Sequence, residues 1–337
     1  MRTASASEPS ANRGRTAKRP QDIPATGWWD ITSRIAKRLA SDNVTLVAGG
    51  VAMYALLSVF PGLAAAVSVY GIFASPGDVI KHLNVFSGVL PPGVLDIFNT
   101  QLQNLARHQQ STLSIAAALG VVIALWSARS AMSALMSATN IAYGEREKRH
   151  FIVQALISLA LTAGAIVGFL GTLLLAVAVP LGLKVLGASE WVQWTIAVLR
   201  WVVLWLAAIV GLACLYRYAP ARQPARWRWL TWGSAIAATL WLAMSVLFAV
   251  YVRNFANYGK TYGALGGVIA LLMWFYLSSI LVVLGAEINA EMERQTKKDT
   301  TEGPEAPMGQ RGAYAADTVG PSAGENDSTE ERQVRGR

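Results

Sequence analysis

Long stretches without a charged residue are the feature that most limits what this chain can fold into. Between Asp42 and Asp78 there is no charged residue, and the apolar part up to Phe73 exceeds the roughly 20 residues that an α-helix needs to cross a bilayer. Of all residues 53% are hydrophobic and 15% are charged, against about 25% charged in an average soluble domain. The sequence therefore predicts an integral membrane protein.

Six apolar stretches predict an all-α integral membrane fold, a bundle of six transmembrane helices within a membrane domain over residues 42–292. Helices are the expected element because backbone groups inside lipid must bond within their own segment. The predicted spans are residues 42–73, 113–141, 151–183, 191–216, 229–252 and 262–286.

The distribution of lysine and arginine predicts the orientation, because short basic loops are retained in the cytoplasm. Basic residues concentrate before residue 43, at 144–150, at 217–228 and after 293. The alternate connections hold only Lys81, Arg107, Lys184, Arg253 and Lys260. Both termini are thus expected in the cytoplasm.

The flanks of the membrane domain are polar. Residues 1–27 predict a disordered cytoplasmic arm and residues 293–337 a disordered cytoplasmic tail. Between the arm and the first span, residues 28–41 predict an interfacial amphipathic helix lying on anionic lipid, with an ordinary solvated helix as the alternative. The first outer loop, residues 74–111, predicts short amphipathic helices, since its apolar residues recur at helical spacing (Leu95, Phe98, Leu102 and Leu105).

Ionisable residues inside spans are candidate functional groups, because charge in hydrocarbon is costly unless it is paired, snorkels to the surface or faces water. Arg129 lies near the middle of the second span and predicts an internal polar cavity. Arg200 lies near the outer end of the fourth span, where snorkelling and function are both open. Glu287, with Asn289 nearby, lies at the inner end of the sixth span and predicts a salt bridge to a basic loop residue.

Small residues four positions apart predict close helix packing, because apolar side chains alone do not drive helices together in lipid. Gly164 and Gly168 form such a pair in the third span, with chance as the alternative explanation.

No residue pattern indicates catalysis, so the chain is expected not to be an enzyme and to hold no cofactor or metal. His82, His108 and His150 lie in loops without a carboxylate or cysteine at metal-ligand spacing. The single cysteine, Cys214, lies in an apolar stretch and predicts plain packing. The net charge of +9 follows from membrane topology, so membrane lipids and not nucleic acid are the expected partners.

The pattern of aromatic, small and polar residues resembles the YihY / virulence factor BrkB family of bacterial inner-membrane proteins, formerly labelled ribonuclease BN. The resemblance covers nearly the whole membrane region but does not include Arg129. Its motifs in this chain are Ala48, Tyr54, Leu57, Ser58, Phe60 and Pro61; Trp126 and Ser127; Asn140, Tyr143, Glu145 and Arg149; Tyr216, Arg217, Tyr218, Ala219 and Pro220, with Trp227 or Trp229 and Gly233 following; and Tyr258, Tyr262, Gly263, Ala264, Leu265, Gly266, Trp274, Tyr276, Gly285, Ala286, Glu287, Ile288 and Asn289.

The resemblance implies a six-helix membrane fold and a role connected with envelope integrity, with transport or flipping of a lipid or other anionic amphiphile as the functional hypothesis. The polar motif residues fall at the inner ends of spans two, four and six, where they form either a polar vestibule or a set of interface anchors. The candidate functional residues are Arg129, Asn140, Tyr143, Arg149, Tyr216, Arg217, Pro220, Tyr258, Tyr262, Gly263, Glu287 and Asn289.

Two other functions are weighed against transport. A non-transporting membrane scaffold predicts a solid bundle in which Arg129 is neutralised internally. The ribonuclease of the older family label requires a metal cluster or a general acid and base, and the sequence offers neither. The sequence specifies no oligomeric state and no coupling ion.

Overall fold

The computed structural model describes residues 13–73, 113–185, 189–254 and 265–323. Six long helices run through them: α2 (Val44–Phe73), α5 (Leu113–Tyr143), α6 (Phe151–Val185), α7 (Glu190–Tyr218), α8 (Trp227–Asn254) and α10 (Leu265–Glu293). A 3-10 helix, η2 (Pro20–Asp22), and α1 (Ala25–Ser41) precede them, and α11 (Tyr314–Asp317) follows. The described residues form no strand, and Ala225 and Thr301 make an isolated bridge.

The helices fall where the apolar stretches predicted them, which confirms the all-helical fold. Within the described part of the chain, four helical segments are long and apolar enough to cross a membrane: Phe151–Gly168, Val198–Tyr218, Trp227–Arg253 and Gly266–Glu293. A fifth is added if α1 and the first part of α2, which meet at a 65° bend, count as one broken span. Six spans remain a prediction, and the predicted helices of the first outer loop lie outside the described residues.

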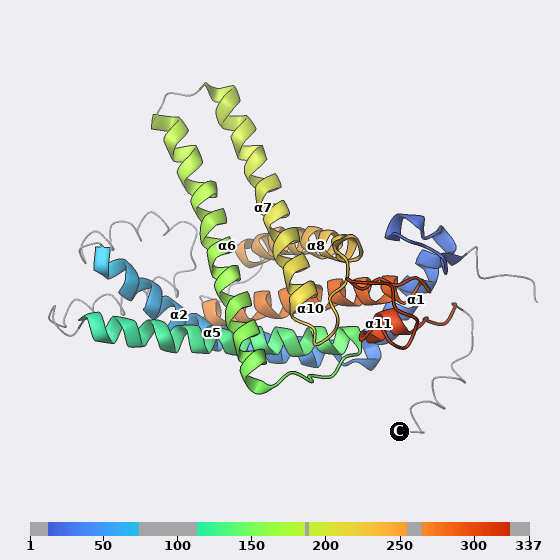
Figure 1. Ribbon diagram of the computed structural model, residues 1–337. Coiled ribbons are helices and arrows are strands. Elements are labelled where there is room, and N and C mark those ends of the chain that lie inside the picture. Colours follow the sequence, from blue (N-terminus) through green and yellow to red (C-terminus); the bar gives the residue numbers. More distant parts are fainter. Residues whose placement is uncertain (1–12, 74–112, 186–188, 255–264, 324–337) are drawn as a thin grey trace, which may run out of the picture.

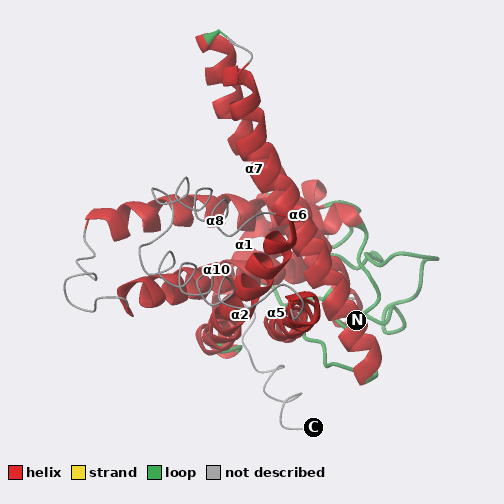
Figure 2. Cartoon of the chain, turned by 90° about the vertical axis from the view of Figure 1, so that its left-hand side faces the viewer, coloured by secondary structure: helices red, strands yellow, loops and turns green. Residues whose placement is uncertain are grey.

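Helix α10 lies at the centre of the molecule, in contact with α1, α2, α5 and α8. Helices α6 and α7 form a hairpin that crosses these helices. The halves of α6 and α7 next to their connection project beyond the rest of the molecule (Figures 1 and 2). In the other halves of the hairpin, α6 packs against α5 and α7 packs against α8.

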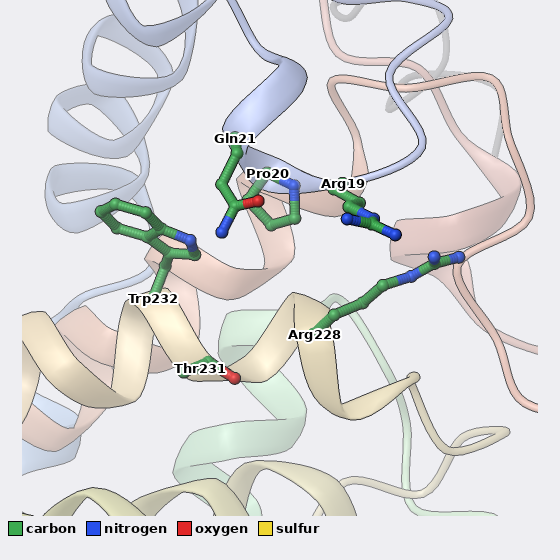
Figure 3. Close-up of a pocket in the computed structure, with 6 residues that line it drawn as sticks. All are labelled: Arg19, Pro20, Gln21, Arg228, Thr231 and Trp232. Carbon is green, nitrogen blue, oxygen red and sulfur yellow. The ribbon is translucent and has the colours of Figure 1, made fainter.

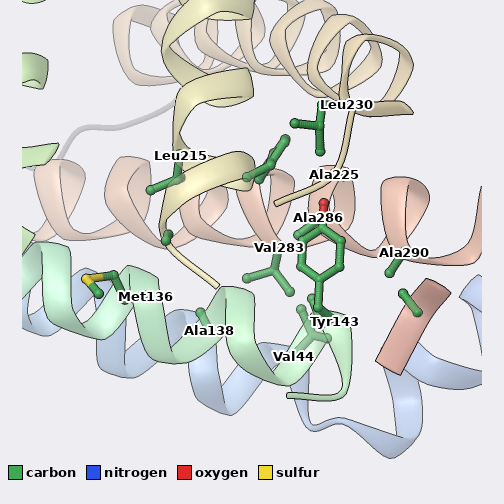
Figure 4. Close-up of a cluster of buried hydrophobic side chains, with 14 of the residues drawn as sticks. Val44, Met136, Ala138, Tyr143, Leu215, Ala225, Leu230, Val283, Ala286 and Ala290 are labelled. Atoms are coloured by element: carbon green, nitrogen blue, oxygen red, sulfur yellow. The ribbon is translucent and has the colours of Figure 1, made fainter. Parts of the chain in front are cut away.

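The buried core lies at the end of the molecule where α5, α7 and α10 end. Small residues dominate it, so the helix backbones approach closely there (Figure 4). Gly285 on α10 shows how close the contact is, because a Cβ at that position would meet the Tyr216 hydroxyl and lie 2.7 Å from the Ala237 Cβ. Gly164 and Gly168 have no such neighbour within 4 Å among the described residues, so this pair makes no close contact with another described helix.

The interfacial helix expected at residues 28–41 is present as α1, but its apolar face packs on protein. Ile31 and Ile35 are buried in a cluster with Trp229 of α8 and Met292 of α10. Trp29, on another face of α1, is 70% exposed. The apolar periodicity correctly predicted an amphipathic helix, but residues of α8 and α10 cover its apolar face.

Disorder was the wrong prediction for residues 13–27 and for residues 294–323. Together with α1 and the end of α10 these segments make a folded unit, and we call residues 13–24 and 294–323 the polar cap. The Gln295 Nε2 donates to the Arg13 carbonyl at 2.7 Å, and the Lys297 backbone N–H donates to the Arg15 carbonyl at 2.8 Å. Each segment alone has too little apolar surface to fold, and each is ordered by contact with the other. Residues 1–12 and 324–337 lie outside the described residues.

Candidate functional site

Three carboxylates at the end of α10 form the centre of the most polar buried region. Glu287 and Glu291 stand four residues apart on one helix face, Glu293 follows, and all three are completely buried. Buried carboxylates are stable only if they are neutralised or hydrogen-bonded. Arginines from α1, from the α7–α8 loop and from the polar cap supply most of that neutralisation. We call this group the arginine–glutamate cluster; its members are Arg34, Arg38, Arg222, Arg294, Glu287, Glu291 and Glu293.

Glu291 binds three arginines. The Arg34 Nε donates to one carboxylate oxygen, and the other oxygen accepts from Arg294 at 2.7 Å and from Arg38 at 3.1 Å. Arg34 also donates to the Gln295 Oε1 at 2.7 Å. Since Arg34 and Arg38 both belong to α1, Glu291 fixes α1 against α10.

Glu293 and Arg222 form a buried two-pronged ion pair. The two guanidinium nitrogens of Arg222 donate to the two carboxylate oxygens at 3.1 and 2.7 Å, and the side chains are 1% and 0% exposed. The guanidinium carbon lies 4.8 Å from the centre of the Tyr143 ring, and the Thr300 hydroxyl donates to the same carboxylate at 2.7 Å. This pair joins the α7–α8 loop to α5, α10 and the polar cap.

The Glu287 carboxylate accepts fewer hydrogen bonds than the carboxylates of Glu291 and Glu293. The Arg38 guanidinium approaches it at 3.4 Å, but neither carboxylate oxygen has a hydrogen-bond partner among the described residues. The basic neighbour predicted for Glu287 therefore belongs to α1.

Tyr216 and Asn289, two of the predicted residues, connect helices through backbone atoms. The Tyr216 hydroxyl donates to the Val282 carbonyl at 2.8 Å, and the Asn289 Oδ1 accepts the Gly233 backbone N–H at 3.0 Å. These bonds hold α7 and α8 against α10. Tyr143 is completely buried between them and the arginine–glutamate cluster.

Asn140, Arg149 and Pro220 meet at the connection between α5, α6 and α7. The Asn140 Oδ1 accepts the Ala221 N–H at 2.7 Å, and Arg149 donates to the Ala219 carbonyl at 2.7 Å. Arg149 also donates twice at 2.7 Å to Glu147, which holds the pKa of that carboxyl below its ordinary value. Pro220 is buried beside these bonds.

Arg217 is buried at the end of α7 and donates to the Ala225 carbonyl and to Glu302 of the polar cap. Its guanidinium also lies 4.7 Å from the centre of the Trp227 ring. The structure thus brings eight of the twelve predicted residues to one end of the molecule. Tyr258, Tyr262 and Gly263 lie outside the described residues, and Arg129 lies elsewhere.

Arg129 is half-buried at the crossing of α5 and α6. Its Nε donates to the Ser158 hydroxyl at 3.2 Å, and its guanidinium lies 4.7 Å from the Trp126 ring and 5.3 Å from the Phe151 ring. No ion pair reaches it from the described part of the chain.

The paired arginines were the part of the site that the sequence analysis missed. Arg34 and Arg38 stand four residues apart, as do Glu287 and Glu291, so two charged faces of matching spacing were visible. The basic residues were instead assigned to lipid and topology. Among the described residues, no group of three His, Cys, Asp or Glu side chains is placed to hold a metal ion.

The fold and the distribution of apolar helices define a multi-pass helical membrane protein. The virulence factor BrkB family model matches residues 35–309, and the chain belongs to this family. The chain is 33% identical over 250 residues to the ribonuclease-like protein YfkH of Bacillus subtilis, covering 73% of this chain and 89% of the relative. It is 28% identical over 260 residues to the UPF0761 membrane protein IL2447 of Idiomarina loihiensis, covering 76% and 88%. No solved structure matches.

Proposed function

We propose that the chain crosses a bacterial inner membrane six times, with both ends in the cytoplasm, and that it moves an anionic lipid or other anionic amphiphile. The observation that carries the proposal is the environment of Arg129. Its guanidinium is held by a hydroxyl and two aromatic rings, and no carboxylate among the described residues neutralises it. An arginine in this setting keeps its charge and its donors available for an anion.

The position of Arg129 favours a lipid headgroup over a soluble anion. Although Arg129 is midway along α5, its neighbour Phe151 is the first residue of α6 and follows a loop that contains Arg146, Lys148 and Arg149. In the proposed orientation this loop lies at the inner leaflet, so Arg129 is within reach of inner headgroups.

The surface around Arg129 suits acyl chains. The rings that flank the guanidinium are open to the outside, with Trp126 58% and Phe151 63% exposed. Ile152 and Leu156 continue the exposed apolar surface along α6. A cation bordered by exposed apolar side chains fits a molecule with a charged head and a hydrocarbon tail.

The test is lipid scrambling in liposomes that contain a fluorescent anionic phospholipid. We expect the natural chain to move the lipid, Arg129→Gln to slow it at least about tenfold, as loss of a charge-assisted contact implies, and Arg129→Lys to retain part of the rate. The matched control is Arg200→Gln, which removes another arginine from an apolar helix, one that is exposed and stacked on Trp201 at 5.8 Å. Equal rates in all four proteins, or no scrambling by any, would contradict the transport proposal.

The orientation is tested separately with reporters fused to the two ends. A reporter that is active only in the cytoplasm should be active at both termini. If the two termini were found in opposite compartments, an even number of spans would be contradicted.

A scaffold that supports the envelope without transport is the second candidate, and the polar cap favours it. The two segments of the polar cap fold against each other and against α10. The cap therefore offers an ordered surface to a partner. If liposomes show no transport while deletion of residues 294–323 abolishes the cellular phenotype of the intact chain, the scaffold replaces the transporter. In both proposals the chain is not an enzyme, and the ribonuclease-like name of the Bacillus relative is not carried over.

A further inference from the structure

An open cavity of about 400 Å³ lies between the polar cap and the start of α8, which also contact each other. Residues of the cap line one side and residues of the first turns of α8 line the other (Figure 3). The lining residues are Arg19, Pro20, Gln21, Arg228, Thr231 and Trp232. None of them belongs to the arginine–glutamate cluster or to the surroundings of Arg129.

Two cations face this cavity. The side chains of Arg19 and Arg228 come from segments more than two hundred residues apart in sequence, and both extend toward the same side of the cavity (Figure 3). No ion pair within the described residues includes either of them. Two like charges that share one cavity repel each other, and an anion bound between them relieves the repulsion.

The nearest acidic residue in sequence, Asp22, does not fill that role. Its Oδ2 accepts the backbone N–H groups of Lys18 and Arg19 at 3.2 and 2.9 Å, so it closes its own turn. The Gln21 amide and the Thr231 hydroxyl add neutral hydrogen-bonding groups to the lining.

We propose that Arg19 and Arg228 form a binding site for a phosphate group, a site separate from Arg129 and independent of whether the chain transports lipid. Arginine binds two phosphate oxygens at once, and Arg19 and Arg228, both exposed to solvent at the open side of the cavity, offer two such groups to a single phosphate. The phosphate comes from a lipid headgroup or from a free anion. Trp232, which packs on Trp28 at 6.2 Å between ring centres, and the exposed Trp29 give the surroundings the character of a membrane interface.

The experiment measures binding to the purified full-length chain in a neutral detergent. Three probes are compared: dihexanoyl phosphatidylglycerol, dihexanoyl phosphatidylcholine and inorganic phosphate. The variants are Arg19→Gln and Arg228→Gln, with Arg253→Gln as the matched control because it removes an exposed arginine from the other end of α8. Thermal unfolding of each variant verifies folding, and Arg19→Gln keeps the test valid if Arg228→Gln does not fold.

We expect saturable binding that each site variant weakens about tenfold, as the loss of one charge-assisted contact implies, and that Arg253→Gln leaves unchanged. Binding of phosphatidylglycerol alone identifies a lipid headgroup as the source, and competitive binding of inorganic phosphate identifies a free anion. Both outcomes support the site. Equal binding by the natural chain and both site variants, an equal loss in Arg253→Gln, or no binding of any probe would overturn it.

Discussion

The arginines of the arginine–glutamate cluster and Arg129 are chemically identical side chains in different surroundings. In the cluster, Arg222 is 1% exposed and is bound at two points to a fully buried carboxylate. At the crossing of α5 and α6, Arg129 is half-buried and bonds to a hydroxyl. The first arrangement neutralises its charge within the protein, whereas the second leaves the charge available to a molecule from outside.

The two regions therefore have different roles. Around the cluster, α1, α5, α8, α10 and both segments of the polar cap are joined by ion pairs and backbone hydrogen bonds. Around Arg129, exposed apolar side chains surround the charge, and the α6–α7 hairpin leaves the other helices (Figure 1). Polar residues within a membrane protein are therefore not equivalent evidence of function, and the partner of each decides its role.

Breaking the pair between Arg222 and Glu293 tests the structural assignment and has the largest expected effect. Arg222→Gln leaves Glu293 buried without its cation, which costs about 3–5 kcal/mol of unfolding free energy. Thermal unfolding in detergent measures the loss. In the double variant Arg222→Met with Glu293→Met, removal of both charges should recover part of it, and a double variant less stable than Arg222→Gln would contradict the pairing.

Close packing at the same end of the molecule predicts the next effect. Gly285→Ala places a Cβ against the Tyr216 hydroxyl and 2.7 Å from the Ala237 Cβ, so it should cost about 1–3 kcal/mol. Gly164→Ala lies on the α6–α7 hairpin, where a Cβ would meet no described atom within 4 Å, so it should be neutral or stabilise the chain by up to about 1 kcal/mol through helix propensity. Equal thermal stability of the two variants would show that the two regions are packed alike.

The helices could be predicted from the sequence, but the folded structure of the polar cap could not. Apolar runs of about 20 residues or more locate helices because the requirement is local. The cap depends on contacts such as that between Gln295 and Arg13, whose partners are 282 positions apart, and each segment alone has the composition of a disordered chain. Likewise Glu287 and Asn289 could be named as candidates from the sequence, whereas the pairing of Glu291 with Arg34 depends on how α1 docks on α10.

Acid should loosen the polar cap through Asp299, an effect smaller than those above. Burial acts to raise the pKa of Asp299, but hydrogen bonds from the Ala306 and Thr301 N–H groups at 2.9 Å and the nearby Arg311 outweigh it, so the pKa lies below its ordinary value of 3.8. A depressed pKa contributes stability above the ordinary value, and the contribution is lost as the pH falls through the value in the folded state.

Proteolysis of the tail between pH 7 and pH 3 measures this effect with a protease active over the range. The natural chain should be resistant at neutral pH and become sensitive below about pH 4, near the ordinary pKa of an aspartate. Asp299→Asn should be more sensitive at neutral pH and change less with acid. Identical pH profiles for the two proteins would exclude Asp299 as the titrating group.

The smallest expected change in stability is at Arg129. Arg129→Gln removes one hydrogen bond at 3.2 Å and two cation–π contacts, but it also removes a charge from an apolar helix, so the unfolding free energy should change by less than about 1 kcal/mol. The same variant should lose the interaction with anionic lipid. A loss of stability as large as that of Arg222→Gln would mean that Arg129 is neutralised inside the protein, and the contrast between the two regions would fail.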